Sequence, residues 1–142
     1  FTAMDQHGKN VTLTDFRGKS SVVLYFYPKD FTPGCTMQAC SFRDHTDVIR
    51  GLGAEVLGVA DGSVEKHRDF AKSLALDFPL LCDERGEIAA LFGVARLGGR
   101  LPPRRATFII DRDGVVRDVF HYEVRLSKHL NDTLAALRAL AR

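Results

Sequence analysis

The sequence lacks several features that would place it in a broad class at once. No stretch of its 142 residues approaches the ~20 apolar residues of a membrane-spanning helix, so we expect no membrane partner. No basic stretch followed by an apolar run opens the chain, and we therefore expect no signal peptide, although a start at Phe1 is compatible with a removed segment. Basic residues are spread out and the formal net charge is only +2, which argues against a nucleic-acid partner.

Cysteine is scarce, and its number is odd: the chain has three, Cys35, Cys40 and Cys82. A domain of this length buries about 68–70% of its unfolded surface, so it can fold without covalent staples. An odd cysteine count in such a domain is not that of a secreted disulfide framework. We therefore expect a reducing, cytoplasmic location, where cysteines are kept for chemistry or fill a core.

The pattern of apolar residues predicts strands that alternate with helices. There is no internal repeat, low-complexity tract or linker, so we expect residues 1–142 to form a single domain, and the abrupt start is compatible with a truncated N-terminus. Strands are predicted at 11–13, 22–27, 56–60, 78–81, 106–110 and 115–122. Helices are predicted at 35–50, from Ser63 to Leu74, at 87–92, and from about Ser127 to Ala141.

This alternation predicts a mostly parallel central sheet with helices on both faces. A hairpin around residues 111–114 adds antiparallel strands to it. The expected fold is α/β and thioredoxin-like, with a central mixed β-sheet flanked by helices, although the pattern alone does not separate it from a flavodoxin-like fold. In such sheets the chemistry sits at the carboxyl ends of the strands.

The segment at one such strand end, residues 28–40, reads PKDFTPGCTMQAC and places Cys35 in the first turn of a helix. Free amides and the helix dipole favour an anion there, and this position lowers the pKa of a cysteine. The loop is short enough for Thr32 to turn its hydroxyl toward the sulfur, and Gly34 lets a backbone amide approach a ligand. Pro28 stiffens the loop and shields the sulfur from water. These features predict an activated thiolate nucleophile.

Cys40 lies five positions after Cys35 on the same predicted helix. In an intact helix their α-carbons would be about 8.7 Å apart, whereas a disulfide needs less than about 7 Å. The two can therefore pair only if the first turns unwind. The alternatives are that Cys40 is an inert core residue and that Cys82, at a strand end without a basic partner, is structural or incidental.

Other cysteine chemistries fit the spacing less well. The chain has no Cys-x-x-Cys pair of the dithiol oxidoreductases, and no cysteine is followed by an arginine at the spacing of the cysteine phosphatases. A zinc site formed by Cys35, Cys40, His45 and Cys82 would match no common ligand spacing. We therefore expect no metal.

Two overlapping motifs of the segment resemble a known family. The pattern PxxxTxxC at 28–35 is similar to the signature of the peroxiredoxins, and TPGCTxxAC at 32–40 resembles their Q-type, or bacterioferritin comigratory protein, branch. Residues 78–81 and 105–111 also resemble segments of this family. The resemblance implies a thioredoxin-like fold and a thiol-dependent peroxidase that reduces hydrogen peroxide and organic hydroperoxides.

The resemblance also implies roles for residues of the motif. Cys35 would be the peroxidatic thiolate that becomes a sulfenic acid, and Cys40 the resolving thiol that forms an intramolecular disulfide with it. Thr32 would hold thiolate and peroxide in line, Pro28 would shield the site, and amides near Gly34 would complete it.

An arginine outside the motif is implied as well. Arg105 matches the family's arginine beside the sulfur, which stabilises the thiolate and the charge that develops on the leaving oxygen. Neighbouring strand residues point to opposite faces, so Arg104 and Arg105 cannot both face the sulfur. Arg43, on the predicted helix of Cys35, is a further candidate, and the choice of Arg105 rests on the resemblance.

The family's usual reductant is thioredoxin or a similar dithiol protein, and the resemblance implies no metal or organic cofactor. We expect a monomer, with a weak dimer as the alternative. Cys82 stands where a serine is more usual, which leaves open which thiol resolves. The alternative function is a non-catalytic redox sensor that uses the same dithiol switch.

Overall fold

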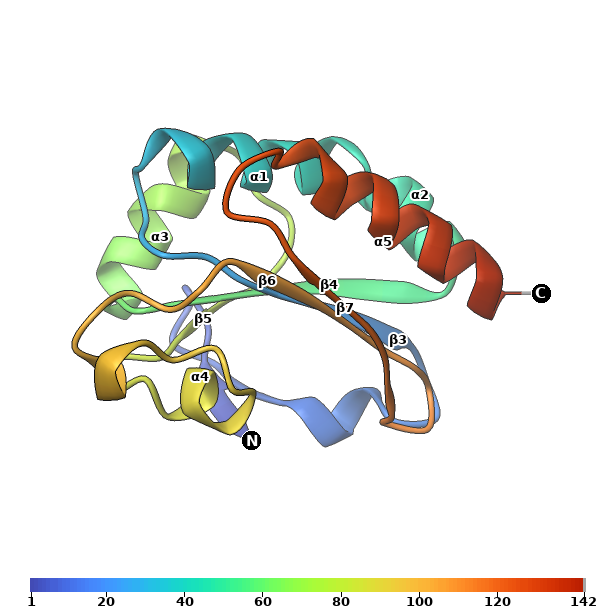
Figure 1. Ribbon diagram of the computed structural model, residues 1–142, viewed down its shortest axis with the longest axis horizontal. Coiled ribbons are helices and arrows are strands. Elements are labelled where there is room, and N and C mark those ends of the chain that lie inside the picture. Colours follow the sequence, from blue (N-terminus) through green and yellow to red (C-terminus); the bar gives the residue numbers. More distant parts are fainter. Residues whose placement is uncertain (142) are drawn as a thin grey trace.

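Strands and helices alternate along the chain, and the computed structural model describes residues 1–141 (Figure 1). The strands are β1 (Thr2–Met4), β2 (Asn10–Thr12), β3 (Ser21–Phe26), β4 (Ala54–Ala60), β5 (Leu80–Cys82), β6 (Ala106–Ile110) and β7 (Val116–His121). The α-helices are α1 (Pro33–Asp44), α2 (Thr46–Gly51), α3 (Val64–Ser73), α4 (Glu87–Leu91) and α5 (Ser127–Leu140). Short 3-10 turns cover Leu13–Phe16 and Leu97–Gly99.

Five of the strands form one mixed sheet in the order β5-β4-β3-β6-β7. The pairs β3–β4 and β4–β5 are parallel, whereas β6 runs antiparallel to both β3 and β7. All six residues of the central strand β3 are buried, because its apolar run meets protein on both faces. The predicted mixed sheet, with a C-terminal hairpin adding antiparallel strands, is confirmed.

Helices cover both faces of this sheet. In Figure 1, α1, α2, α3 and α5 lie over one face, and α4 and the N-terminal segment lie over the other. Alternate side chains of β3 enter the two cores. Tyr25 packs with Phe42 of α1 and Leu137 of α5 in one core, and Phe26 packs with Phe108 in the other. The helix that carries the first two cysteines therefore rests on the central strand.

The single helix predicted at 35–50 is wrong, because the structure divides this stretch into two. α1 ends at Asp44 and α2 begins at Thr46, and between them His45 has φ −121° and ψ 10°, outside the helical region. The Thr46 hydroxyl donates to the carbonyl oxygen of Arg43 at 3.0 Å, which satisfies an acceptor at the end of α1. At its other end α1 begins at Pro33, and proline is well suited to the first helical position because it has no amide hydrogen to leave unpaired.

Smaller differences concern the strands and the last helix. The strand predicted at 78–81 is found at Leu80–Cys82, because the Gln6 side chain bonds the carbonyl oxygen of Phe78, ahead of the strand, and the amide of Leu80, its first residue. The first strand pair includes Thr2–Met4, which was not predicted. Ala141 lies outside α5 and is exposed. The predicted cap of α3 is present, since Ser63 Oγ accepts the amide of Lys66 at 3.1 Å.

Among residues 1–141, no helix combines the length and the apolar character needed to cross a bilayer.

Candidate active site

Cys35 lies in the first turn of α1, just after the loop that leaves the carboxyl end of β3. Its exposed fraction is 1%, and it belongs to the core that α1 forms with the sheet. Pro33 and Gly34 precede it within the helix, so its sulfur lies where backbone amides lack intrahelical partners and the helix dipole is positive. The fold therefore places a nearly buried sulfur where a negative charge is favoured.

Arg105, next to β6, brings a positive charge to this sulfur. Its Nη2 donates to Cys35 Sγ at 3.4 Å, and the residue is 7% exposed. The rival arginines do not reach the sulfur. Arg104 is exposed, and Arg43 donates to the carbonyl oxygen of Leu74 and pairs with Asp44. The structure thus brings together the cysteine and the arginine that the sequence analysis selected.

Gln38 is a site residue that the sequence analysis missed. It lies three residues after Cys35 on α1, is 2% exposed, and accepts a bond from Arg105 Nη1 at 2.6 Å. Residues three apart share a helix face, and this spacing could have identified it. Because the amide is neutral, it orients the guanidinium without compensating its charge, which remains available to the sulfur.

Two buried donors at this site have no hydrogen-bond partner in the described chain. They are Gln38 Nε2 and Arg105 Nε. Buried polar hydrogens without a partner are costly. The site therefore combines a sulfur nucleophile with unused donors around it.

Gly34 lies in a crowded part of the site. A Cβ at this position would meet Leu126 Cδ1 at 3.1 Å and Arg105 Nη2 at 3.2 Å. Leu126 immediately precedes α5, and Glu123 in the same connection accepts the backbone amide of Arg105 at 2.9 Å. The connection between β7 and α5 therefore packs over the start of α1, and Gly34 leaves room for it.

Thr32 differs from the expectation that its hydroxyl is turned toward the sulfur. Its Oγ1 donates to the carbonyl oxygen of Lys29 at 2.9 Å. The residue is the extended N-cap of α1, with φ −92° and ψ 148°, and this conformation closes the loop onto Lys29. Since its only proton is used in this way, the hydroxyl can meet a ligand only as an acceptor.

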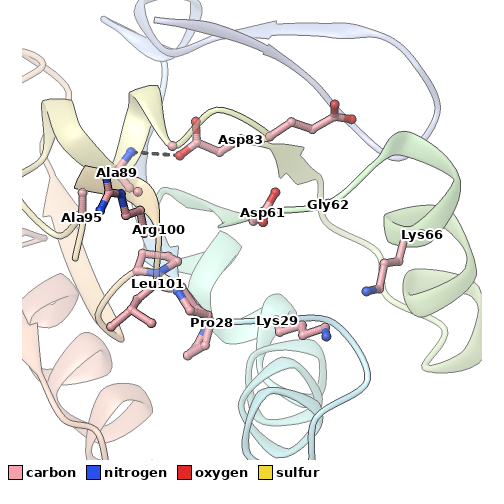
Figure 2. Close-up of a pocket in the computed structure, with 15 residues that line it drawn as sticks. Pro28, Lys29, Asp61, Gly62, Lys66, Asp83, Ala89, Ala95, Arg100 and Leu101 are labelled. Carbon is pink, nitrogen blue, oxygen red and sulfur yellow. Dashed lines mark hydrogen bonds between the residues drawn. The ribbon is translucent and has the colours of Figure 1, made fainter. Parts of the chain in front are cut away.

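Pro28 is half-buried and lines a cavity of about 330 Å³ beside the site. Figure 2 shows Pro28 and Lys29 on one side of this cavity, with Leu101 next to Pro28. Cys35 is not among the lining residues. The cavity therefore adjoins the loop that carries the sulfur and does not enclose the sulfur itself.

Two tyrosines lie beneath this loop. Burial raises the pKa of Tyr25 well above its usual value, and negative charge on Cys35 raises it further. Burial likewise raises the pKa of Tyr27, followed by the effects of Tyr25 and Asp30. Both phenols are therefore protonated at neutral pH, and they add no competing negative charge near the sulfur.

The other two cysteines are free thiols in different surroundings. Cys40 is half-buried on α1 and shares that unbroken helix with Cys35. Cys82 is half-buried at the end of β5, where burial, followed by the charges of Glu84, Asp30 and Asp5, raises its pKa to about 11.

Among the described residues, no three His, Cys, Asp or Glu side chains come together as metal ligands. The zinc arrangement of Cys35, Cys40, His45 and Cys82 that was considered from the sequence is therefore not assembled.

Comparison with known proteins bears directly on this site. The model of the AhpC/TSA family matches residues 1–119, which include the whole segment around Cys35 and also Arg105. The chain belongs to the AhpC/TSA family. Two relatives named "Peroxiredoxin Q, chloroplastic", from Sedum lineare and Gentiana triflora, are each 45% identical to it over 99% and 98% of the chain. The chain spans 75% and 64% of the lengths of these relatives.

Solved structures agree over nearly the whole chain. Peroxidoxin BcpB from Mycobacterium tuberculosis superposes with a TM-score of 0.93 at 41% identity, covering 99% of this chain and 92% of that one. The bacterioferritin comigratory protein of Xanthomonas campestris superposes with a TM-score of 0.92 at 31% identity, covering 100% and 92%. The predicted resemblance to Q-type peroxiredoxins and the thioredoxin-like fold are both confirmed.

A carboxylate at position 38 should weaken the thiolate of Cys35. In Gln38→Glu the new charge competes with the sulfur for Arg105, so Cys35 should react with iodoacetamide about ten times more slowly near neutral pH. The rates are measured by mass spectrometry across pH. Met37→Glu is the matched control, because Met37 is 65% exposed and its carboxylate would be solvated. An equal loss of rate in the two variants would contradict this role of Gln38.

Cys82 should be nearly inert in the folded protein. With a pKa of about 11, roughly one molecule in a thousand carries its thiolate at pH 8, and the thiolate is the reactive form. Limited alkylation at pH 8 followed by peptide mapping should label Cys35 well before Cys82, and denaturant should remove the difference. Faster labelling of Cys82 than of Cys35 in native protein would contradict the prediction.

Proposed function

We propose that this protein is a thiol-dependent peroxidase that reduces hydrogen peroxide and organic hydroperoxides with the thiolate of Cys35. The proposal rests on the position of the Arg105 guanidinium, whose Nη2 lies 3.4 Å from Cys35 Sγ. This sulfur is nearly buried and lies at a helix N-terminus. Membership of the AhpC/TSA family and 45% identity to peroxiredoxin Q proteins support it. The similar Xanthomonas campestris protein is itself described by its alkyl peroxide reduction activity.

The first step is oxidation of Cys35. Its thiolate attacks one oxygen of the peroxide, the O–O bond breaks, and the cysteine becomes a sulfenic acid while the other oxygen leaves as hydroxide or alkoxide and takes up a proton. Arg105 stabilises both the thiolate and the charge on the leaving oxygen. Thr32 presents only lone pairs, so it accepts the peroxide's own hydrogen and orients it. Amides near Gly34 donate to the peroxide, and Pro28 restricts access of water.

The second step joins Cys35 to Cys40. The thiolate of Cys40 attacks the sulfenic sulfur, the S–O bond breaks as the disulfide forms, and the hydroxide that leaves takes up a proton to become water. Because both residues lie on α1 with α-carbons about 8.7 Å apart by helical geometry, the helix must unwind first. Among the bonds to be broken is the one from the Thr36 amide to the Thr32 carbonyl oxygen, at 2.9 Å.

Recycling needs an external dithiol. Thioredoxin or a similar protein reduces the disulfide by thiol–disulfide exchange, supplying two electrons and becoming oxidised itself. The scheme uses no metal or organic cofactor and no second copy of the chain, so we place the activity in a monomer. A reducing compartment such as the cytoplasm supplies the dithiol.

Peptide mapping after one equivalent of peroxide tests the assignment of the two thiols. The native chain should yield a Cys35–Cys40 disulfide. Cys40→Ser should stop at a sulfenic acid that dimedone traps, and Cys35→Ser should leave both remaining thiols reduced. A Cys35–Cys82 bond would move the resolving role to Cys82.

Repeated peroxide consumption with a thioredoxin system supports an enzyme, whereas a single stoichiometric oxidation would indicate a sensor.

Removing the guanidinium should slow the first step selectively. Arg105→Ala should lower the second-order rate of Cys35 oxidation by about 100-fold or more, the usual cost of losing one preorganised donor. Arg104→Ala is the matched control, because it removes the same group from the neighbouring exposed position. Rapid-quench mass spectrometry follows both variants. An unchanged rate in Arg105→Ala would show that another group stabilises the sulfur.

A further inference from the structure

Asp30 is the one fully buried residue within the described segment 28–34, whose other residues are half-buried or exposed. The exposed fraction of its side chain is 0%. Removing a carboxyl group from water is costly unless hydrogen bonds replace those to the solvent. The partners of Asp30 therefore show what holds the loop that leads to Cys35.

Two side chains bind the carboxyl group of Asp30. Tyr27 donates its hydroxyl to Oδ1 at 2.7 Å, and Nδ1 of His67 lies 2.5 Å from Oδ2. The other ring nitrogen of His67, Nε2, lies 3.2 Å from the carbonyl oxygen of Ala60 and 3.1 Å from that of Leu81. Carbonyl oxygens only accept, so Nε2 carries a proton, and one further proton is shared between Nδ1 and Oδ2.

The Asp30–His67 pair contacts several elements of the fold. His67 lies on α3 and is 0% exposed, and its two carbonyl partners belong to the carboxyl ends of β4 and β5. Gly62 lies against the pair, since a Cβ there would meet the His67 ring at 3.0 Å. Figure 2 shows Lys29 and Lys66, the sequence neighbours of Asp30 and His67, around the adjoining cavity. The contact ties the loop to α3 and to two strand ends.

The next residue, Phe31, shows that the loop is held under strain. Its φ is +63°, in the left-handed region that a bulky residue rarely adopts. Such a conformation persists only where the surrounding structure holds it. The ring of Phe31 packs edge-on against Phe70 at 5.2 Å, and Phe70 lies three residues after His67 on α3. Both contacts of the loop therefore fall on one face of that helix.

We propose that Asp30 and His67 are positioning residues for Cys35, forming a hydrogen-bonded latch that fixes the loop during attack on peroxide and stays closed while α1 unwinds. The inference rests on the proposed function, since it assigns the step that the latch serves. The latch acts through Thr32 and the start of α1, and neither of its residues contacts Cys35 by a hydrogen bond.

Unwinding does not require the latch to open. The α-carbons of Cys35 and Cys40 must approach by only about 2 Å from their helical separation to satisfy a disulfide. Gly34, half-buried between the latch and the sulfur, supplies a flexible backbone position for this change. Breaking the latch contact would instead leave Oδ2 of the buried carboxyl group and Nδ1 of the buried imidazole without a partner. The segment that moves therefore begins after Thr32.

Kinetics of the two steps test the positioning role. Rapid-quench mass spectrometry separates sulfenic acid formation from disulfide formation in the 142-residue chain. Asp30→Ala should slow sulfenic acid formation by about 100-fold, as expected for a misplaced nucleophile, without slowing the disulfide step. In Asp30→Asn the amide can accept from Tyr27 and donate to Nδ1 of a neutral His67, so most of the rate should return. His7→Ala, an exposed histidine, is the matched control and should react as the native chain does.

These results distinguish a positioning role of Asp30 from an effect on the stability of the fold alone. A variant that is only less stable would have a lower unfolding temperature, yet both of its steps would keep native rates well below that temperature. Native-like sulfenic acid formation in Asp30→Ala would overturn the proposal. If Asp30→Asn forms sulfenic acid as slowly as Asp30→Ala, the proposal is also overturned. The hydrogen bonds at position 30 would then not be what positions the loop.

NMR spectra of the native chain test the latch without depending on whether a variant folds. The imidazole signals of His67 in ¹H–¹⁵N NMR spectra should be the same in the reduced and the disulfide forms, while the backbone amides of Cys35 and Gln38 shift. Loss of the native His67 signals in the disulfide form would show that the latch opens and would overturn the proposal. If peroxide does not oxidise Cys35 in the native chain, the proposed function fails. If the native chain and Asp30→Ala react equally fast, only the latch proposal fails.

Discussion

The proposed chemistry depends on holding negative charge on a sulfur that is almost excluded from water. Burial alone opposes ionisation of a thiol, so the charge requires fixed partners. The first turn of α1 supplies partial positive charge, and Arg105 supplies a full one at 3.4 Å. The guanidinium is in turn oriented by Gln38, whose neutral amide leaves the charge of the arginine to the sulfur. Replacing this amide by a carboxylate would keep the geometry and change the electrostatics.

The sheet brings these groups together from distant parts of the sequence. Phe26, at the end of β3, pairs with Ala106 in the antiparallel ladder with β6. Arg105 immediately precedes Ala106, so the register places it beside the loop that leaves β3 and becomes α1. A register shift of one residue would turn Arg104 toward this loop in place of Arg105. The position of the charge is therefore set by strand pairing, which the large buried core on both faces of β3 makes rigid.

Local patterns in the sequence predicted the strands of the main sheet and most helices, and they placed Cys35 in the first turn of a helix, although this helix begins two residues earlier, at Pro33. These features depend on periodicity and on proline and glycine. The helix break at His45 was not predicted, because no proline or glycine marks it. Choosing Arg105 over Arg104 needed a family resemblance, because alternation alone does not say which face meets the sulfur. The contact between Asp30 and His67 joins residues 37 positions apart, and spacing along one element cannot reveal a contact between two.

The break between α1 and α2 limits how far melting can spread. Helix unwinding is cooperative along a continuous run of hydrogen bonds, and His45 interrupts this run after Asp44. Ile49, which is fully buried, keeps α2 seated in the core, and its amide bonds the carbonyl oxygen of His45 at 3.0 Å. In the proposed disulfide form, order would thus be lost over only a few turns between two anchored ends. Reduction would let this short segment re-form without refolding the domain, as repeated cycling requires.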